Sequence, residues 1–323
     1  MTKNTKIFLA AFAVSLPFWW GVNILNLQLE EFFLYNQLAK NPQMFTAQAK
    51  LLRQVQKIRP VLKSNSESLS LNARAATSVL VRENSTSKVL FQDSPQEPFP
   101  IASLTKLMTA YVVAEHFLLE QEIVISKSAI AEEESFGQLR VGDRFTMRDL
   151  LYPLLMESSN DAAAAFALHI GKEAFVDLMN LETKRLGLTN TKFVNHAGLD
   201  PDDAGGPINY STTKDLFLLT RSLKEQYPDI FSILALQEQP LYTLQGSFHH
   251  TMANTNELLA NNGWPTRIVG GKTGWTPEAQ GALILVLESP KNKGYVVNII
   301  LYSPARFEEM KKLVDWVYNS YLW

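Results

Sequence analysis

The sequence predicts an α+β protein that carries an N-terminal membrane-spanning helix. Three observations support this prediction: β-like runs lie near both ends of the globular part, helical patterns fill the middle, and an apolar run precedes them all. When strands and helices are segregated along a chain, the strands form an antiparallel sheet and the helices pack against it. We therefore expect a sheet whose strands come from both chain ends, with a helical cluster between them.

The strands and helices of the globular part are placed by residue periodicity. Residues 75–82 and 88–92 flank the polar turn ENSTS and predict a β-hairpin. Two further strands are expected late in the chain, at 281–288 and 295–302. The expected helices cover residues 102–119, 145–156, 161–170, 172–186, 212–226 and 307–318.

Several helix ends carry recognisable capping signals. Thr146 is followed three residues later by Asp149, which predicts an acidic variant of the capping box. Thr212 and Asp215 repeat that pattern at a later helix start. Gly171 is expected to end the helix before it, because glycine readily adopts the backbone conformation of a C-terminal cap.

The N-terminal apolar run, residues 7–27, is long enough to cross a bilayer, which takes about 20 residues. Lys3 and Lys6 precede it, which favours a cytoplasmic N-terminus and an extracytoplasmic position for the rest of the chain. A cleaved signal peptide is the competing interpretation, but no A-x-A-like triplet follows the run. We expect an uncleaved single-pass anchor in the cell membrane, after a cytoplasmic tail at 1–6; a buried core helix is the remaining alternative.

A connector is expected between the anchor and the globular part. Residues 28–69 include one amphipathic helix, at 44–59, bounded by Pro42 and Pro60. The polar run LKSNSESLS that follows reads as a linker. The globular domain is therefore expected to span residues 70–323.

Composition narrows the classes of function. The chain of 323 residues has 30 Lys+Arg against 32 Asp+Glu, a net charge of −2 that gives no general attraction to nucleic acid. It has no cysteine, which excludes disulfides and thiolate nucleophiles. Its five histidines form no H-E-x-x-H pattern, so a metalloprotease of that type is not expected. His249 and His250 are an adjacent pair able to bind a metal, but we expect a strand or turn that points the two rings opposite ways.

The first of three chemical motifs is Ser103-Leu104-Thr105-Lys106. Residues three apart share a face of a helix, so the lysine amine is within reach of the serine hydroxyl. A serine at a helix N-terminus also lies in a field that favours developing negative charge. By itself the pattern is frequent, and a solvated helix face is its ordinary explanation.

The other two motifs are Ser158-Ser159-Asn160, between two expected helices, and Lys272-Thr273-Gly274, in an extended segment. Taken singly, the former suits a helix cap. The latter fails the phosphate-loop pattern, because Pro265 stands where a glycine is required. Together with the preceding S-x-x-K, and in this order along the chain, these two motifs form the set that penicillin-binding proteins and class A β-lactamases share.

The chain from about residue 70 to 323 resembles the low-molecular-mass penicillin-binding D-Ala-D-Ala carboxypeptidases, serine peptidase family S11. Beyond the motifs, the resemblance extends to LNARAATSVLVREN, PFPIASLTKLMTAYV, VGDRFTMRDLLYPLLMESSNDAAAAFA, LGLTNTKFVNHAGLD and NYSTTKDL. It implies a β-lactamase/transpeptidase-like fold. The sequence departs from the family in its N-terminal anchor, in Ser159 where glycine is commoner, and in Trp275 after the KTG motif.

The resemblance also implies roles for residues. Ser103 would be the nucleophile, Lys106 its base and Ser158 a proton relay, in a reaction that needs no metal or organic cofactor. The substrate-binding residues would be Asn160, Lys272, Thr273, Gly274, Trp275 and Arg306, with the backbone N–H groups of Ser103 and Trp275 as an oxyanion hole. The implied partners are peptidoglycan stem peptides ending in D-Ala-D-Ala, and β-lactams as covalent inhibitors.

Three other functions stay open at this point. A peptidoglycan DD-endopeptidase has the same motifs and differs in the shape of its cleft. A class A β-lactamase uses a glutamate for deacylation, but the segment GLDPDD offers only Asp200, Asp202 and Asp203, which suit an acidic turn. A non-catalytic peptidoglycan-binding protein would be expected to lack Ser103, Lys106 or Lys272, and the chain has all three.

Overall fold

The computed structural model describes residues 60–83, 85–130, 138–201, 203, 205–261, 263–290 and 294–323. Residues Lys63–Tyr321 form one compact unit, which is described here by itself. The expected anchor at 7–27 and the amphipathic helix at 44–59 lie outside the described residues. Within the described residues, no helix combines the length and the apolar character needed to cross a membrane.

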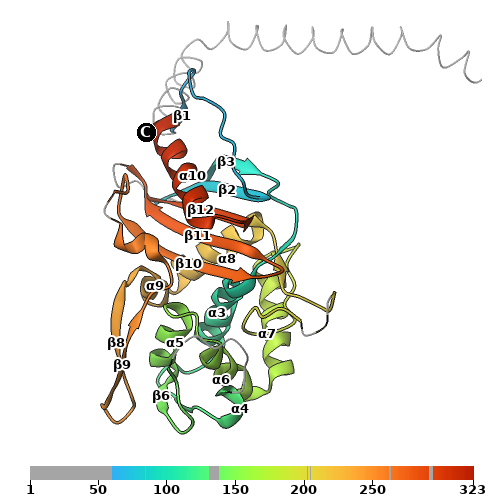
Figure 1. Ribbon diagram of the computed structural model, residues 1–323, viewed down its shortest axis with the longest axis vertical. Coiled ribbons are helices and arrows are strands. Elements are labelled where there is room, and N and C mark those ends of the chain that lie inside the picture. Colours follow the sequence, from blue (N-terminus) through green and yellow to red (C-terminus); the bar gives the residue numbers. More distant parts are fainter. Residues whose placement is uncertain are drawn as a thin grey trace, which may run out of the picture. The chain divides into compact units, whose positions relative to one another are not determined.

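A five-stranded antiparallel sheet runs through the unit in the order β10-β11-β12-β2-β3 (Figure 1). Its strands are β2 (Ala75–Arg82), β3 (Ser87–Asp93), β10 (Ile268–Thr276), β11 (Gln280–Glu288) and β12 (Gly294–Ser303). The predicted hairpin β2–β3 forms, and β12 pairs with β2, with Val297 opposite Val79. The prediction that the sheet draws on both chain ends is therefore confirmed.

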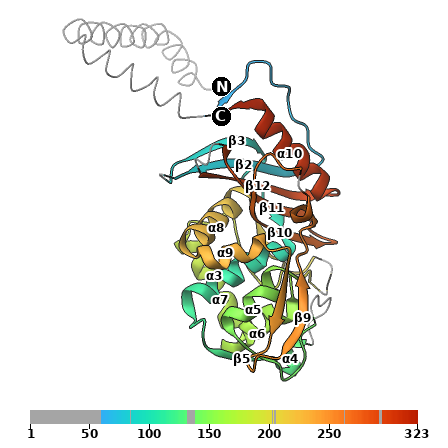
Figure 2. The same cartoon turned by 90° about the vertical axis from the view of Figure 1, so that its left-hand side faces the viewer.

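The helices cover both faces of this sheet. They are α3 (Lys106–His116), α4 (Lys127–Ile130), α5 (Met147–Leu155), α6 (Asn160–Ile170), α7 (Lys172–Arg185), α8 (Thr213–Gln226), α9 (Pro228–Ser232) and α10 (Arg306–Ser320). Figure 2 shows α10 on one face, while α8, α3 and the helices beyond them lie on the other. The remaining elements are β1 (Val61–Leu62), β4 (Phe99–Pro100), β5 (Glu122–Val124), β6 (Arg144–Thr146), β7 (Tyr210–Ser211), β13 (Tyr321–Leu322), η1 (Ala102–Thr105), η2 (Ile233–Ala235) and η3 (Glu257–Ala260).

The predicted helix starts are confirmed at α5 and corrected at α3. Thr146 Oγ1 accepts a hydrogen bond from the Asp149 backbone N–H (3.0 Å) and donates to its carboxylate (2.6 Å), as the capping signal predicted. The expected helix at 102–119 is divided instead. Residues Ala102–Thr105 form a 3-10 turn, and α3 ends at His116 because Phe117 is extended.

A second hairpin, β8 (Glu238–Tyr242) with β9 (Phe248–Ala253), was not predicted. Leu241 pairs with His250 and Tyr242 with Phe248, so His249 is the extra residue of a β-bulge. The prediction that the rings of His249 and His250 point opposite ways is wrong. Their ring centroids are 4.8 Å apart, because the bulge turns both side chains to the same side.

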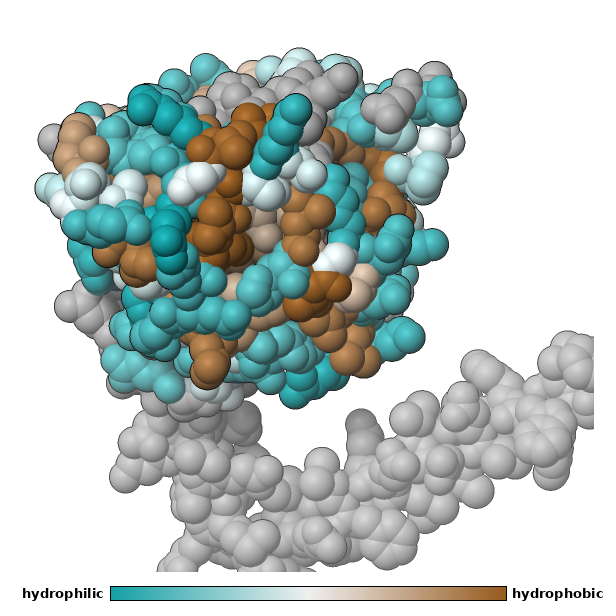
Figure 3. Space-filling view, turned by 90° about the horizontal axis from the view of Figure 1, so that it is seen from below, coloured by the Kyte–Doolittle hydropathy of each residue, from teal (hydrophilic) through white to brown (hydrophobic). Residues whose placement is uncertain are grey.

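Exposed apolar side chains are scattered over the described surface. Val124, Val141, Tyr242 and Phe248 are each at least half exposed. The face seen from below in Figure 3 shows hydrophobic areas separated by hydrophilic side chains. Isolated exposed apolar residues are ordinary on protein surfaces and require no special explanation.

The interior holds an uncommon feature. Lys106 and Lys272 have exposed fractions of 0% and 1% and rank among the largest fully buried side chains. Lysines are almost never fully buried unless other groups compensate their charge. The polar groups around these two lysines therefore form the candidate site.

Candidate active site

Ser103 and Lys106 lie where the chain enters α3. The 3-10 turn η1 carries Ser103, and Lys106 is the first residue of the helix. Lys106 Nζ lies 2.9 Å from Ser103 Oγ, in hydrogen-bonding contact. Ala102, just before the serine, has a left-handed φ of 46°, which marks a tight and unusual turn at this point.

Lys106 is held by three oxygen acceptors. Besides Ser103 Oγ, its Nζ donates to Asn160 Oδ1 and to the Ala197 carbonyl, each at 2.8 Å. Burial and then the neighbouring charge of Lys272 hold the pKa of Lys106 well below its ordinary value of 10.5. A lowered pKa increases the fraction of neutral amine at a given pH, and a neutral amine can accept the proton of Ser103.

In the second motif, one side chain caps a helix and the other two contact the buried lysines. Ser159 caps α6, since its hydroxyl accepts a hydrogen bond from the Ala162 N–H at 3.1 Å. Ser158 has a left-handed φ of 61°, a strained conformation for a residue other than glycine. Its hydroxyl accepts a hydrogen bond from Lys272 Nζ at 2.9 Å. The loop thus presents Ser158 to one buried lysine and Asn160 to the other.

The third motif lies on β10, at the edge of the sheet. Burial and then the charge of Arg306 lower the pKa of Lys272 from 10.5 to about 7. Thr273 Oγ1 lies 2.6 Å from Thr255 Oγ1. A Cβ on Gly274 would lie 3.0 Å from the Ile101 carbonyl, so this glycine lets the strand approach the turn that carries Ser103.

Two predicted substrate-binding residues border this cluster. Trp275 is 56% exposed at the end of the KTG segment. Arg306 begins α10, and its guanidinium lies over the Phe307 ring at 4.6 Å. Among the residues that the structure describes, Arg306 Nε is buried and has no hydrogen-bond partner. Gly281, which pairs with Trp275, lies against Arg306, because a Cβ on Gly281 would lie 3.0 Å from Arg306 Cβ. Arg306 therefore borders the cluster.

Sequence reasoning missed several groups that complete the cluster. The Ala197 carbonyl and the Thr255 hydroxyl contact motif residues directly. Asn209 Nδ2 donates to Thr105 Oγ1 at 3.0 Å and braces the turn from behind. No local sequence pattern identifies these groups. A backbone carbonyl or an isolated polar residue contacts the motif residues only because the fold places it next to them.

The acidic segment after Gly198 connects two parts of the structure. Asp200 accepts hydrogen bonds from Thr276 Oγ1 (2.7 Å) and from the Glu278 N–H (3.0 Å). Asp202 lies outside the described residues, and the Asp203 carbonyl accepts from Gly206 in a turn. Asp200 therefore ties this loop to the end of β10.

A substitution at Gly198 tests the close packing behind Ser103. Its φ is 89°, and a Cβ there would lie 1.9 Å from the Ala102 carbonyl oxygen. We expect Gly198→Ala to lower the free energy of unfolding by about 3 kcal/mol or more, and to slow any reaction of Ser103. The control is Gly187→Ala, whose φ is 71° and whose Cβ would meet nothing within 4 Å, with an expected cost of about 1–2 kcal/mol. Equal losses in urea denaturation would contradict the close contact.

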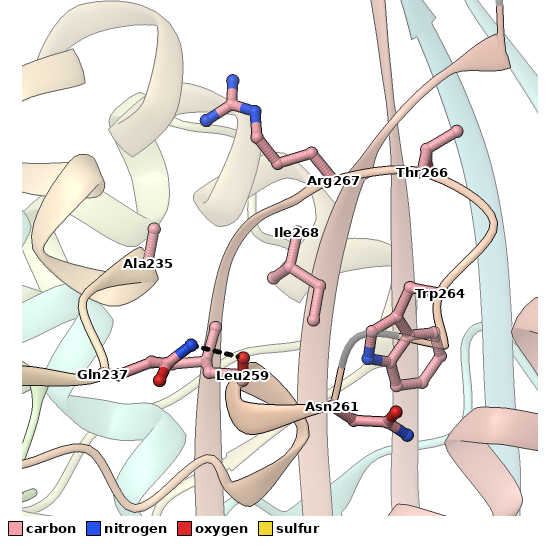
Figure 4. Close-up of a pocket in the computed structure, with 8 residues that line it drawn as sticks. All are labelled: Ala235, Gln237, Leu259, Asn261, Trp264, Thr266, Arg267 and Ile268. Carbon is pink, nitrogen blue, oxygen red and sulfur yellow. Dashed lines mark hydrogen bonds between the residues drawn. The ribbon is translucent and has the colours of Figure 1, made fainter.

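A cavity of about 570 Å³ lies beside the start of β10 (Figure 4). It is lined by Ala235, Gln237, Leu259, Asn261, Trp264, Thr266, Arg267 and Ile268, and Gln237 donates to the Leu259 carbonyl at 2.7 Å. None of the predicted site residues lines it. Ile268 precedes Lys272 by four residues, about 13 Å along a strand. The cavity is therefore separate from the serine–lysine cluster.

Comparison with known proteins gives the family. The model of the D-alanyl-D-alanine carboxypeptidase family, peptidase S11, matches residues 63–303. The chain is similar to a D-alanyl-D-alanine endopeptidase of Pseudomonas aeruginosa, with 36% identity over 68% of this chain and 70% of the relative. It is also similar to D-alanyl-D-alanine carboxypeptidase DacC of Escherichia coli, with 30% identity over 79% of this chain and 63% of the relative.

Solved structures agree with the sequence comparison. The Streptomyces K15 DD-transpeptidase is 28% identical, with a TM-score of 0.68 over 78% of this chain and 99% of that one. A D-alanyl-D-alanine carboxypeptidase of Mycobacterium tuberculosis is 25% identical, with a TM-score of 0.70 over 80% of this chain and 96% of that one. The fold is thus the penicillin-binding, transpeptidase-like fold, and the chain belongs to the S11 family of serine peptidases, the D-alanyl-D-alanine carboxypeptidases.

Proposed function

We propose that this protein is a serine-type D-Ala-D-Ala carboxypeptidase that removes the terminal D-Ala from peptidoglycan stem peptides in cell-wall maturation. The observation that carries the proposal is the contact of 2.9 Å between Ser103 Oγ and Lys106 Nζ, with the lysine fully buried. A buried lysine of lowered pKa beside a hydroxyl is the arrangement that activates a serine nucleophile. Membership of the S11 family supports the same activity.

Acylation follows from this geometry. Neutral Lys106 accepts the Ser103 proton while Ser103 Oγ bonds to the carbonyl carbon of the penultimate D-Ala. The backbone N–H groups of Ser103 and Trp275 stabilise the oxyanion. Ser158 relays this proton from Lys106 to the leaving amine, and the peptide bond breaks to release D-Ala and leave an ester on Ser103.

Substrate binding and deacylation involve the remaining groups. Lys272 and Thr273 bind the terminal carboxylate, Arg306 adds a second positive charge, and Asn160 holds a substrate amide. Water then attacks the ester and regenerates Ser103. A β-lactam presents a strained amide to the same oxygen, so we expect it to acylate Ser103.

These two lysines give opposite pH dependences. Acylation rises with pH as Lys106 loses its proton, because only the neutral amine acts as a base. Carboxylate binding falls as Lys272 loses its proton, which in the free protein occurs near its pKa of about 7. A bound carboxylate stabilises the charged form of Lys272 and extends binding to higher pH.

A DD-endopeptidase that cleaves peptide cross-links is the second candidate. Two relatives, from Pseudomonas aeruginosa and Escherichia coli, are named D-alanyl-D-alanine endopeptidases and are 36% and 32% identical. Both activities break a bond after D-Ala through the same acyl-enzyme. They differ in the group that leaves, which is free D-Ala in one case and a second stem peptide in the other.

Two substrates separate these candidates. The protein is incubated with a monomeric pentapeptide ending in D-Ala-D-Ala and, separately, with a cross-linked peptide dimer, and the products are identified by mass spectrometry. We expect release of free D-Ala from the monomer. Turnover of the dimer alone would replace the carboxypeptidase by the endopeptidase, and β-lactam hydrolysis without turnover of either peptide would indicate a β-lactamase.

We also propose a single-pass topology, supported by the apolar run at 7–27 and by Lys3 and Lys6 before it. In this arrangement residues 1–6 are cytoplasmic, 28–69 form a stalk, and the peptidase domain at 70–323 lies outside the membrane. Deleting residues 1–27 is expected to move the protein from the membrane pellet to the supernatant after alkaline extraction. Retention of the shortened chain in the pellet would contradict the anchor.

A further inference from the structure

Four side chains, those of Asp143, His249, His250 and Glu157, form a hydrogen-bonded series beside the loop that carries Ser158. His249 Nε2 lies 2.8 Å from Asp143 Oδ2, and His250 Nε2 lies 3.1 Å from both carboxylate oxygens of Glu157. The two rings meet through their Nδ1 atoms at 2.6 Å. Both imidazoles are buried, with side-chain exposures of 5% and 6%. Within the described part of the chain, Asp143 and Glu157 are the charged groups that these rings contact.

The hydrogen bonds orient both rings. A carboxylate accepts hydrogen bonds, so each Nε2 donates to Asp143 or to Glu157. The two rings held in this way pack against each other, with centroids 4.8 Å apart. Loss of either ring would therefore remove the support of the other.

The spacing of the two histidines does not suit a metal ion. Two histidine nitrogens on tetrahedral zinc, each at about 2.0–2.1 Å from the metal, lie about 3.4 Å apart. The Nδ1 atoms of His249 and His250 are closer, at 2.6 Å. Their Nε2 atoms are directed at carboxylates and not at a common centre.

Glu157 links the histidine pair to the loop that carries Ser158, because Glu157 and Ser158 are adjacent in the chain. Ser158 has a left-handed φ of 61°, a conformation that persists only when its surroundings impose it. The β8–β9 hairpin and the residues just after it contact this loop at two points. His250, on β9, contacts the Glu157 side chain. Beyond the end of β9, the Thr255 N–H donates to the Met156 carbonyl at 3.0 Å. These contacts keep Ser158 Oγ at 2.9 Å from Lys272 Nζ.

We propose that His249 and His250, held between Asp143 and Glu157, are positioning residues for Ser158. This inference rests on the proposed function, in which Ser158 relays the proton to the leaving group. His249 contacts the ring of His250, His250 contacts the Glu157 carboxylate, and Glu157 precedes Ser158 in the chain. Without this support, Ser158 Oγ is no longer held against Lys272 Nζ.

The test measures acylation by a fluorescent penicillin in the full-length protein. In His249→Gln and His250→Gln we expect the limiting acylation rate to fall roughly 10- to 100-fold, with the concentration for half-saturation unchanged. His169→Gln, at an exposed histidine on α6, is the matched control and should behave as the parent.

A conservative variant separates positioning from simple structural damage. In Glu157→Gln the amide oxygen still accepts from His250, so most of the rate should be retained. Glu157→Ala removes that acceptor and should show the loss of rate expected for His250→Gln. Equal rates in Glu157→Gln and Glu157→Ala would contradict a positioning role that acts through the Glu157 side chain.

Urea denaturation checks that each variant is folded before its rate is compared. Folded His249→Gln and His250→Gln variants that acylate at the parental rate would overturn the inference. A rise in the concentration for half-saturation without a fall in the limiting rate would overturn it as well. A parent that is not acylated at all would refute the proposed function instead.

Discussion

Replacing Ser103 by alanine is expected to abolish the covalent mass increase that penicillin causes and to lower peptidase turnover by at least about 10⁴-fold. Among the described residues, the side chain removed is the only one in contact with Lys106 Nζ that can act as a nucleophile, since the other two acceptors are the Asn160 amide and a backbone carbonyl. Intact mass spectrometry of the protein, before and after exposure to penicillin, gives the answer directly.

The matched control is Ser128→Ala, at an exposed serine of α4. It should form the same adduct as the parent and show the same turnover. An adduct on the Ser103 variant would move the nucleophile elsewhere in the chain. Folded parent protein that takes up no penicillin and cleaves neither peptide substrate would favour a non-catalytic peptidoglycan-binding protein.

Lys106→Met is expected to lower the acylation rate by about 10²- to 10⁴-fold, because the serine loses its general base. Methionine fills a similar volume without a titratable group, so the effect reports on proton transfer. Lys127→Met, at an exposed lysine of α4, is the control and should acylate at the parental rate. Parental acylation by the Lys106 variant over the whole pH range would assign the base to another group.

The same variant should change how stability depends on pH. The folded protein holds the pKa of Lys106 well below 10.5, the value expected in the unfolded chain. Between those two values the unfolded state binds more protons, so the free energy of unfolding rises with pH across this window. Lys106→Met should show a smaller rise, though not zero, because Lys272 has a pKa of about 7 and acts in the same direction.

Urea denaturation at about pH 7 and about pH 9 measures this difference. The parent should gain more stability between the two conditions than Lys106→Met does. Equal gains would mean that the ammonium form of Lys106 is not disfavoured in the folded state. The assignment of Lys106 as a base would then lose its physical ground.

Local features of the fold were accessible from the sequence. The hairpin at β2–β3, the late strands and the Thr146 cap were predicted, because periodicity and capping depend on neighbours within a few residues. The β8–β9 hairpin was missed, since its strand signal is interrupted by polar residues and Pro240. The 3-10 turn at Ala102–Thr105 was also missed, because a helix pattern does not distinguish the two helix types over a single turn.

The three motifs and their order along the chain were sufficient to identify the chemistry and the family from sequence alone, because each motif is short and its residue types are chemically constrained. Only the tertiary structure decided which groups contact the motif residues and the residues next to them. The Ala197 carbonyl contacts Lys106, the Thr255 hydroxyl contacts Thr273, and His250 of the histidine pair contacts Glu157. The reason is physical. Burial lowers the pKa of a lysine and long-range hydrogen bonds orient a serine, and both depend on where distant segments meet, which no local pattern encodes.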